Sequence, residues 1–222
     1  MKPPPNFNAL ARAYRWMEWL TFGPWLSRCR CAFLEDLQSS RSALIIGDGD
    51  GRFTARLLKE NAAVVVDALD ASKNMLVALV ENAGIFIGRL RIHLGDARLI
   101  DFPPLPYDLV VSHFFLDCLT TGEVSELATR VRAHVTPSAR WLVSEFAVPE
   151  GLYGWVVARP LITGLYVAFW LLTGLSVHRL PNHREALSGA DFVLTREKKW
   201  LAGLLVSELW TPKPPEPREI VF

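Results

Sequence analysis

Glycines alternate with aspartates directly after a short apolar run, in the stretch LIIGDGDGRF at residues 44–53. The residues concerned are Gly47, Asp48, Gly49, Asp50 and Gly51. Glycine costs backbone entropy, so three glycines this close together indicate a turn whose backbone must approach a ligand closely. Such a turn between a strand and a helix is typical of a nucleotide site.

A second carboxylate supports this interpretation. Asp70 ends the next predicted strand, AVVVDALD, nineteen residues after Gly51, and an acid there can accept hydrogen bonds from ribose hydroxyls. Asp67 is an alternative ribose ligand, and Asp70 could instead cap the helix that follows. The carboxylates within the turn would repel a pyrophosphate, and the spacing is G-x-G-x-G rather than G-x-G-x-x-G. A cationic nucleoside without phosphate, such as S-adenosylmethionine, meets both objections.

The candidate catalytic residues are His113, Asp117 and Glu145. They follow the fourth and fifth predicted strands, at the edge where open parallel sheets bind ligands. A hydroxyl group or an enolisable carbon is activated best by a base whose pKa lies near neutrality, so His113 is the first choice. A packed histidine that only caps the strand is an equally good interpretation.

The elements that must position these residues alternate along the chain. Short β-branched runs are followed by helical patterns up to about residue 146, which predicts an α/β fold with a doubly wound, mostly parallel sheet. Two later runs, close together around Ala202 and Gly203, predict a C-terminal antiparallel hairpin. We expect one domain over 1–222. Its parts are N-terminal helices at 1–38, a cofactor-binding core at 39–150, a helical acceptor cover at 151–188 and the terminal hairpin at 189–211.

Four segments in this order resemble the motifs of the class I S-adenosylmethionine-dependent methyltransferases: IIGDGDGRFTARLL, LDASKNML, GDARLIDFP and YDLVVSHFFLDCL. The resemblance covers about residues 40–210 and points to the small-molecule, quinone-biosynthesis-like branch. It implies a Rossmann-like sheet of seven strands that closes with a reversed hairpin. One position departs from the family, which often has an acid where this chain has Ile45; Asp48 or Asp50 could substitute for it.

The resemblance also implies which residues hold the cofactor. They are Gly47, Asp48, Gly49, Asp50, Gly51, Asp70, Ala71, Met75, Asp96, Ala97, Ser112, His113 and Phe114. Asp70 is expected at the ribose and Asp96 at the adenine amino group. Ser112, His113 and Phe114 are expected at the methionine and methyl-donor end.

Composition limits the partners. The net charge of +1 gives no electrostatic footprint for nucleic acid. Cys29 and Cys31 have no further ligands at metal-site spacing, so no metal is expected. The odd number of cysteines and an N-terminus too polar for a signal peptide favour a cytoplasmic protein. Residues 160–177 carry no charge, which indicates a buried helix or, alternatively, a peripheral contact with a membrane.

Aromatic residues are frequent in the segments expected to cover the acceptor. They are Trp16, Trp19, Trp25, Tyr153, Trp155, Tyr166, Phe169 and Trp170. Core packing explains many of them, but an uncharged aromatic cover also suits an apolar or aromatic small molecule. The sequence therefore predicts a methyltransferase acting on oxygen or carbon of such an acceptor. The alternatives are a catalytically inactive binding protein of the same fold and an NAD-dependent oxidoreductase.

Overall fold

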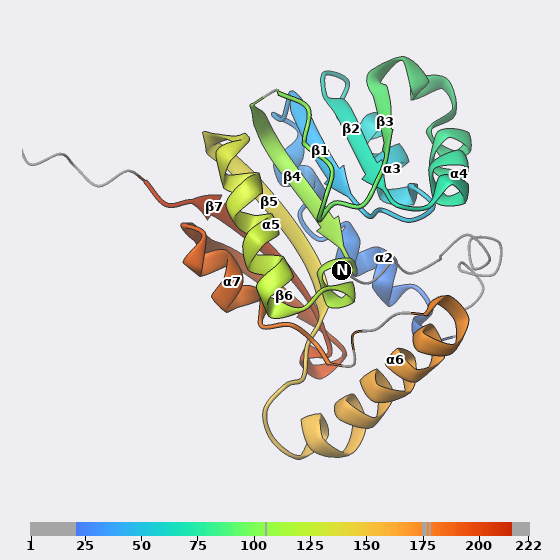
Figure 1. Ribbon diagram of the computed structural model, residues 1–222, viewed down its shortest axis with the longest axis vertical. Helices are drawn as coiled ribbons and strands as arrows, with labels where there is room; N and C mark the ends of the chain where they lie inside the picture. Colours follow the sequence, from blue (N-terminus) through green and yellow to red (C-terminus); the bar gives the residue numbers. More distant parts are fainter. Residues whose placement is uncertain (1–20, 105, 175–176, 178, 215–222) are drawn as a thin grey trace, which may run out of the picture.

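A single sheet runs through the centre of the molecule (Figure 1). The computed structural model describes residues 21–104, 106–174, 177 and 179–214. Within these residues the strands are β1 (Ser42–Ile46), β2 (Val65–Asp70), β3 (Leu90–Leu94), β4 (Tyr107–His113), β5 (Val135–Phe146), β6 (Phe192–Trp200) and β7 (Leu205–Pro212). Their order across the sheet is β3-β2-β1-β4-β5-β7-β6.

The strand directions confirm the predicted fold class. The strands β1 to β5 pair in parallel, and β7 runs antiparallel to both β5 and β6. The β6–β7 connection is the short turn Leu201–Gly203, where Ala202 has a φ of 52°. The described residues therefore form a mostly parallel, Rossmann-like sheet with a reversed hairpin, as expected from the sequence.

Helices cover both faces of the sheet (Figure 1). One face packs against α3 (Arg52–Glu60), α4 (Lys73–Ala83) and the segment after α2 (Trp25–Arg30). The other face packs against α5 (Thr121–Ala133) and α7 (His183–Gly189). Both faces of the central strands are buried, which explains why these strands read as continuous apolar runs.

The predicted acceptor cover is helical as far as residue 173. A π-helical turn at Gly154–Ala158 continues into α6 (Arg159–Thr173), and Gly174 ends the helix with a φ of 74°. Figure 1 shows α6 standing apart from the sheet, alongside α2. The end of the predicted cover, the short helix α7, packs beside α5 and does not line the cavity. The side chain of Asn182 caps α7 by accepting a hydrogen bond from the Glu185 amide. The first predicted N-terminal helix, with Trp16 and Trp19, lies outside the described residues.

Candidate cofactor and acceptor site

A cavity lies at the carboxyl ends of β1, β2 and β4, where open α/β sheets bind ligands. One part of its wall consists of residues at or just after the strand ends, together with Met75 of α4. These are Gly47, Gly49, Asp70, Ala71, Met75, Gly95, Asp96 and Ala97. Another part is apolar and comes mainly from α6 and from aromatic residues near the strand ends. These are Phe22, Leu26, Phe114, Phe115, Phe146, Ile162, Leu165, Tyr166 and Phe169.

The glycines of the turn serve different purposes. Gly47 lines the cavity with a φ of +69°, and a Cβ atom at this position would lie 2.5 Å from Cδ2 of Phe115. Gly51 also has a positive φ, but a Cβ there would collide with Leu79 of α4. Gly47 therefore leaves room at the cavity wall, whereas Gly51 permits two helices to pack together.

The carboxylates of the turn do not line the cavity. Asp48 is buried, and its Oδ2 accepts hydrogen bonds from the Thr54 amide at 2.9 Å and the Thr54 hydroxyl at 2.7 Å. Its Oδ1 has no hydrogen-bond partner among the described residues, and burial raises the pKa of Asp48 to about 6. Asp50 pairs with Arg52 at 2.8 Å. Ile45, at the position where the family often has an acid, is part of the core.

Asp70 reaches the cavity from the end of β2. Its Oδ1 accepts a hydrogen bond from the Ser72 amide at 2.7 Å, and burial raises its pKa to about 6. Ser72 caps α4 by accepting a hydrogen bond from the Met75 amide, so Asp70 is not the N-cap. Asp67, the alternative ribose ligand, is buried away from the cavity.

The side chain of Asp67 is engaged in hydrogen bonds within the sheet. Its oxygens are hydrogen-bonded to Arg91, His93 and Tyr107. It is therefore a structural carboxylate, and the alternative that placed it at the ribose is not supported by its position.

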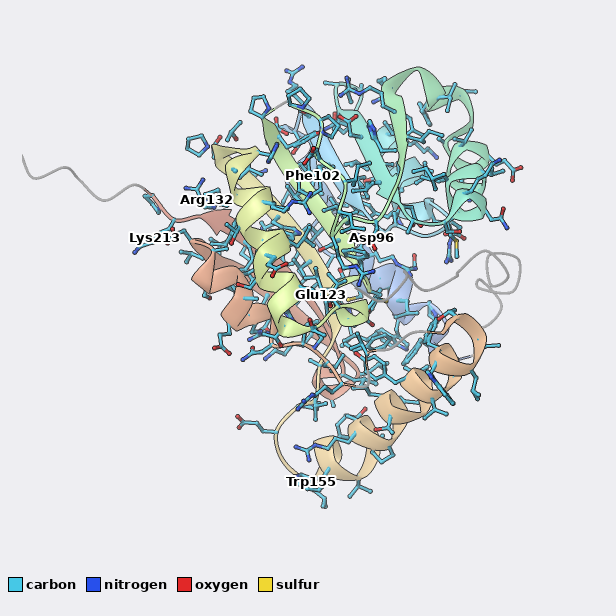
Figure 2. The ribbon with its side chains drawn as sticks, viewed as in Figure 1. Asp96, Phe102, Glu123, Arg132, Trp155 and Lys213 are labelled. Carbon is cyan, nitrogen blue, oxygen red and sulfur yellow. The ribbon has the colours of Figure 1, made fainter. Side chains whose placement is uncertain are left out.

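Asp96 lines the cavity on the turn after β3, together with Ala97. Burial alone would raise its pKa, but hydrogen bonds and charge from Arg98 outweigh burial and lower it. The Arg98 guanidinium lies 2.6 Å from Asp96 and 2.8 Å from Glu123 (Asp96 and Glu123 are labelled in Figure 2). Asp96 is thus held as an ionised acceptor at the cavity wall.

Strand alternation separates the residues at the end of β4. The Ser112 hydroxyl lies on the α5 face, where it accepts a hydrogen bond from Trp141 Nε1 at 3.0 Å. His113 points to the opposite face and packs edge-on against Phe53 of α3. Neither lines the cavity, whereas Phe114, with a φ of 51°, does.

The surroundings of His113 do not suit a base. Both ring nitrogens lack a hydrogen-bond partner among the described residues, and burial, helped by the charge of Arg30, holds its pKa well below the ordinary value. The imidazole is therefore neutral and faces the core. The structure favours the interpretation of His113 as a packed histidine.

Of the predicted catalytic residues, Asp117 is the one that reaches the cavity. Burial raises its pKa to about 6. Glu145 lies behind it, fully buried, and its Oε1 accepts hydrogen bonds from the Phe115 amide at 3.2 Å and the Leu116 amide at 2.8 Å. Burial and the neighbouring charge of Asp117 raise the pKa of Glu145 well above its ordinary value. Glu145 thus holds the loop that carries Asp117.

The predicted aromatic cover is only partly brought to the cavity. Tyr166 and Phe169 line it, but Trp155 and Trp170 are more than half exposed. The sequence analysis did not identify Phe146, Phe115 or the aliphatic α6 residues Ile162 and Leu165, all of which line the cavity. An aromatic residue at or just beyond the carboxyl end of a strand is a signal that would have identified the two phenylalanines, since Phe146 ends β5 and Phe115 follows β4 by two residues.

Comparisons with known proteins agree with this geometry. Residues 43–138 match the family model described as a methyltransferase domain. No curated protein matches this sequence. Among solved structures, the mitomycin 7-O-methyltransferase superposes with a TM-score of 0.68 at 16% identity, covering 93% of this chain and 60% of that one.

Two further structures have the same fold. An O-methyltransferase family 2 protein from Planctomyces limnophilus, in complex with apigenin, gives a TM-score of 0.66 at 18% identity, over 92% of this chain and 60% of that one. A TehB-like SAM-dependent methyltransferase from Corynebacterium glutamicum gives 0.61 at 15% identity, over 92% of this chain and 99% of that one. This chain therefore spans about three fifths of the O-methyltransferases and nearly all of the smaller enzyme.

The motifs, the strand order and these matches lead to one assignment. Residues 43–138 match a methyltransferase domain, and the described residues have the fold of the methyltransferases compared above.

Proposed function

We propose that this chain transfers a methyl group from S-adenosylmethionine to a hydroxyl oxygen of a lipophilic aromatic small molecule. The observation that carries the proposal is a continuous cavity whose wall is polar at the strand ends and apolar along α6. A transferase must hold its cofactor and its acceptor side by side with water excluded, and one continuous cavity allows this.

The polar part of the wall fits the cofactor. Gly47 and Gly49 present backbone without side chains, and Asp70 and Asp96 offer carboxylate acceptors suited to ribose hydroxyls and an adenine amino group. Arg98 also lines the cavity, but its guanidinium is paired with Asp96 and Glu123. The acidic wall favours a cationic nucleoside and disfavours the pyrophosphate of NAD. When bound, S-adenosylmethionine supplies an electrophilic methyl group.

The apolar part of the wall supports an aromatic acceptor. Phe114, Phe146 and Phe169 face the cavity, and its α6 wall carries no charged side chain. Aromatic rings favour edge or offset contacts with other rings, so such a wall selects planar apolar molecules over charged metabolites. The mitomycin 7-O-methyltransferase and the apigenin complex are neighbours in fold, which supports oxygen rather than carbon as the methylated atom.

We assign the role of general base to Asp117. A phenolic hydroxyl becomes a better nucleophile as its proton leaves, and a carboxylate with a pKa near 6 is ionised at neutral pH yet basic enough to accept that proton. In the proposed reaction Asp117 would accept the hydroxyl proton as the methyl carbon exchanges its bond to the cofactor sulfur for a bond to the acceptor oxygen, so that S-adenosylhomocysteine is the leaving group. Glu145 acts through the loop, as a positioning residue.

The test combines binding and transfer. Purified protein is titrated with S-adenosylhomocysteine, and is then assayed with S-adenosylmethionine against a panel of hydroxylated aromatic compounds by mass spectrometry. A mass gain of one methyl group on a phenolic oxygen supports the proposal. Cofactor binding without transfer to any member of the panel would favour the inactive binding protein instead.

A further inference from the structure

The outer face of the helix formed by Gly154–Ala158 and α6 is apolar and exposed. Its solvent-facing side chains are Trp155, Val156, Val157, Val167, Trp170, Leu171 and Leu172, and Leu152 lies just before the helix. Leu171 is 70% exposed and Trp155 is 66% exposed. Figure 2 shows Trp155 at the outer end of the helix, pointing away from the domain. Contiguous apolar surface of this kind usually marks an interaction site.

The inner face of the same helix belongs to the domain. Ile162 and Tyr166 are buried, and the Tyr166 hydroxyl donates a hydrogen bond to the backbone carbonyl of Asp117 at 2.9 Å. The helix Gly154–Thr173 is long and apolar enough to cross a membrane, with a mean hydropathy of 1.6. Because its inner face is packed against the domain, we infer that it lies along a surface rather than spanning one.

The charges around this face point to the kind of surface. Residues 150–182 contain Arg159 and Arg179 against a single acid, Glu150, at the start of the segment. The guanidinium of Arg159 lies 4.0 Å from the centre of the Trp155 ring. Tryptophan and arginine are typical of protein segments at the headgroup region of a membrane. There the indole ring can contact the acyl chains while the guanidinium binds lipid phosphates.

We propose that the face formed by these exposed residues of 152–172 docks on an anionic lipid surface. A second copy of the chain is a poorer partner, because twofold pairing of this face would enclose two copies of Arg159 in an apolar interface, with only Glu150 at its edge to pair them. The cavity lies directly beneath this helix, lined by Ile162, Leu165 and Phe169. An acceptor dissolved in the bilayer would thus be delivered beside the cavity, and this last step rests on the proposed function.

The test is co-sedimentation with vesicles of phosphatidylcholine and phosphatidylglycerol. The full chain is compared with Val156→Glu and Leu171→Glu, which place a negative charge on the outer face. The matched control is Ile85→Glu. Ile85 is 90% exposed and lies in the turn Gly84–Arg89 after α4, outside the apolar face of 152–172. Circular dichroism and titration with S-adenosylhomocysteine verify that each variant is folded.

We expect the full chain and the control to sediment with the vesicles. Each substitution on the helix should weaken vesicle binding about tenfold or more, since it places a charge where an exposed aliphatic group would otherwise be buried in the lipid. Binding should also weaken with salt and with phosphatidylcholine alone.

The proposal would be overturned if the full chain did not sediment with the vesicles, or if Ile85→Glu lost as much vesicle binding as the helix variants. It would also be overturned if sedimentation velocity showed a dimer that Leu171→Glu dissociates. Cofactor binding is measured separately, so failure on vesicles leaves the proposed methyl transfer intact. Failure to bind S-adenosylhomocysteine would remove the proposed function without affecting this result.

Discussion

The hydroxyl of Tyr166 on α6 donates a hydrogen bond to the backbone carbonyl of Asp117, with 2.9 Å between the oxygens. This bond joins α6, which covers the cavity, to the segment whose Asp117 side chain lines the cavity. Glu145 holds the same loop from the sheet side, through the amides of Phe115 and Leu116. Asp117 is therefore fixed from both directions, as expected for a group that must meet an acceptor in one orientation.

Asp117→Asn should lower the rate of methyl transfer about 100-fold or more, because the amide cannot accept the proton. Binding of S-adenosylhomocysteine should change little. In the wild type the rate should fall as the pH drops through about 6, where the Asp117 carboxylate becomes protonated. The matched control is Glu126→Gln, on the exposed side of α5. A variant that kept both the rate and the pH profile would exclude Asp117 as the base.

Tyr166→Phe removes only the hydrogen bond to the Asp117 carbonyl. We expect a loss of about 1 kcal/mol in the free energy of unfolding and a clear fall in kcat/KM for the acceptor. Tyr107→Phe is the control, since its hydroxyl donates to Asp67 in the sheet, at 3.2 Å. That variant should lose comparable stability in urea denaturation and keep its activity. Equal effects of the two variants on activity would contradict a special role for Tyr166.

Gly47→Ala should destabilise the protein by about 1–3 kcal/mol and impair cofactor binding. The backbone there has a φ of +69°, and the added methyl group would lie 2.5 Å from the Phe115 ring. Gly122→Ala is the comparison, because a Cβ there would meet nothing within 4 Å. Thermal unfolding and calorimetric titration of both variants measure the two effects, and a Gly47→Ala protein as stable as Gly122→Ala would refute the steric argument.

Asp48 should make folding stability depend on pH. Burial raises its pKa from 3.8 to about 6 in the folded protein, so the folded state binds the proton more tightly than the unfolded state does. The contribution of Asp48 to the free energy of unfolding should therefore fall as the pH rises from about 4 to about 6. The fall is on the order of 3 kcal/mol for this group.

Asp48→Asn should reduce the pH dependence over this window by the contribution of this one group, since the amide can still accept from Thr54 but cannot ionise, while Asp70 and Asp117 keep theirs. Asp101→Asn, at an exposed position, should leave it unchanged. The measurement is urea denaturation at several pH values. A wild type whose stability rises between pH 4 and 6 would contradict the buried position of Asp48.

The sheet could be predicted from the sequence because its signals are local. Strand and helix runs alternate, and a turn rich in glycine, beginning with Gly47, follows β1. The polar part of the cavity wall could be predicted for the same reason, since Asp70 ends β2 and Asp96 follows β3 by two residues, where topology places them at the cavity. The match of residues 43–138 covers this part of the chain.

The catalytic side was harder to predict, because it depends on which way each side chain points. The strand β4 is buried on both faces and carries no polar alternation to reveal its register. Ser112 and His113 therefore looked equally well placed, yet one is bound to Trp141 and the other packs on Phe53. Phe114 reaches the cavity through a positive φ, and a phenylalanine in the sequence does not predict this backbone conformation.

The central claim is that this cavity binds S-adenosylmethionine through the carboxylate at the end of β2. Calorimetric titration with S-adenosylhomocysteine tests it most directly, on the wild type, on Asp70→Asn and on the control Glu81→Gln, which is exposed on α4. We predict binding by the wild type and the control, at least tenfold weaker binding by Asp70→Asn, and wild-type affinity that declines as the pH falls through about 6. A folded wild type that does not bind, or that binds NAD in competition with S-adenosylhomocysteine, would contradict the account.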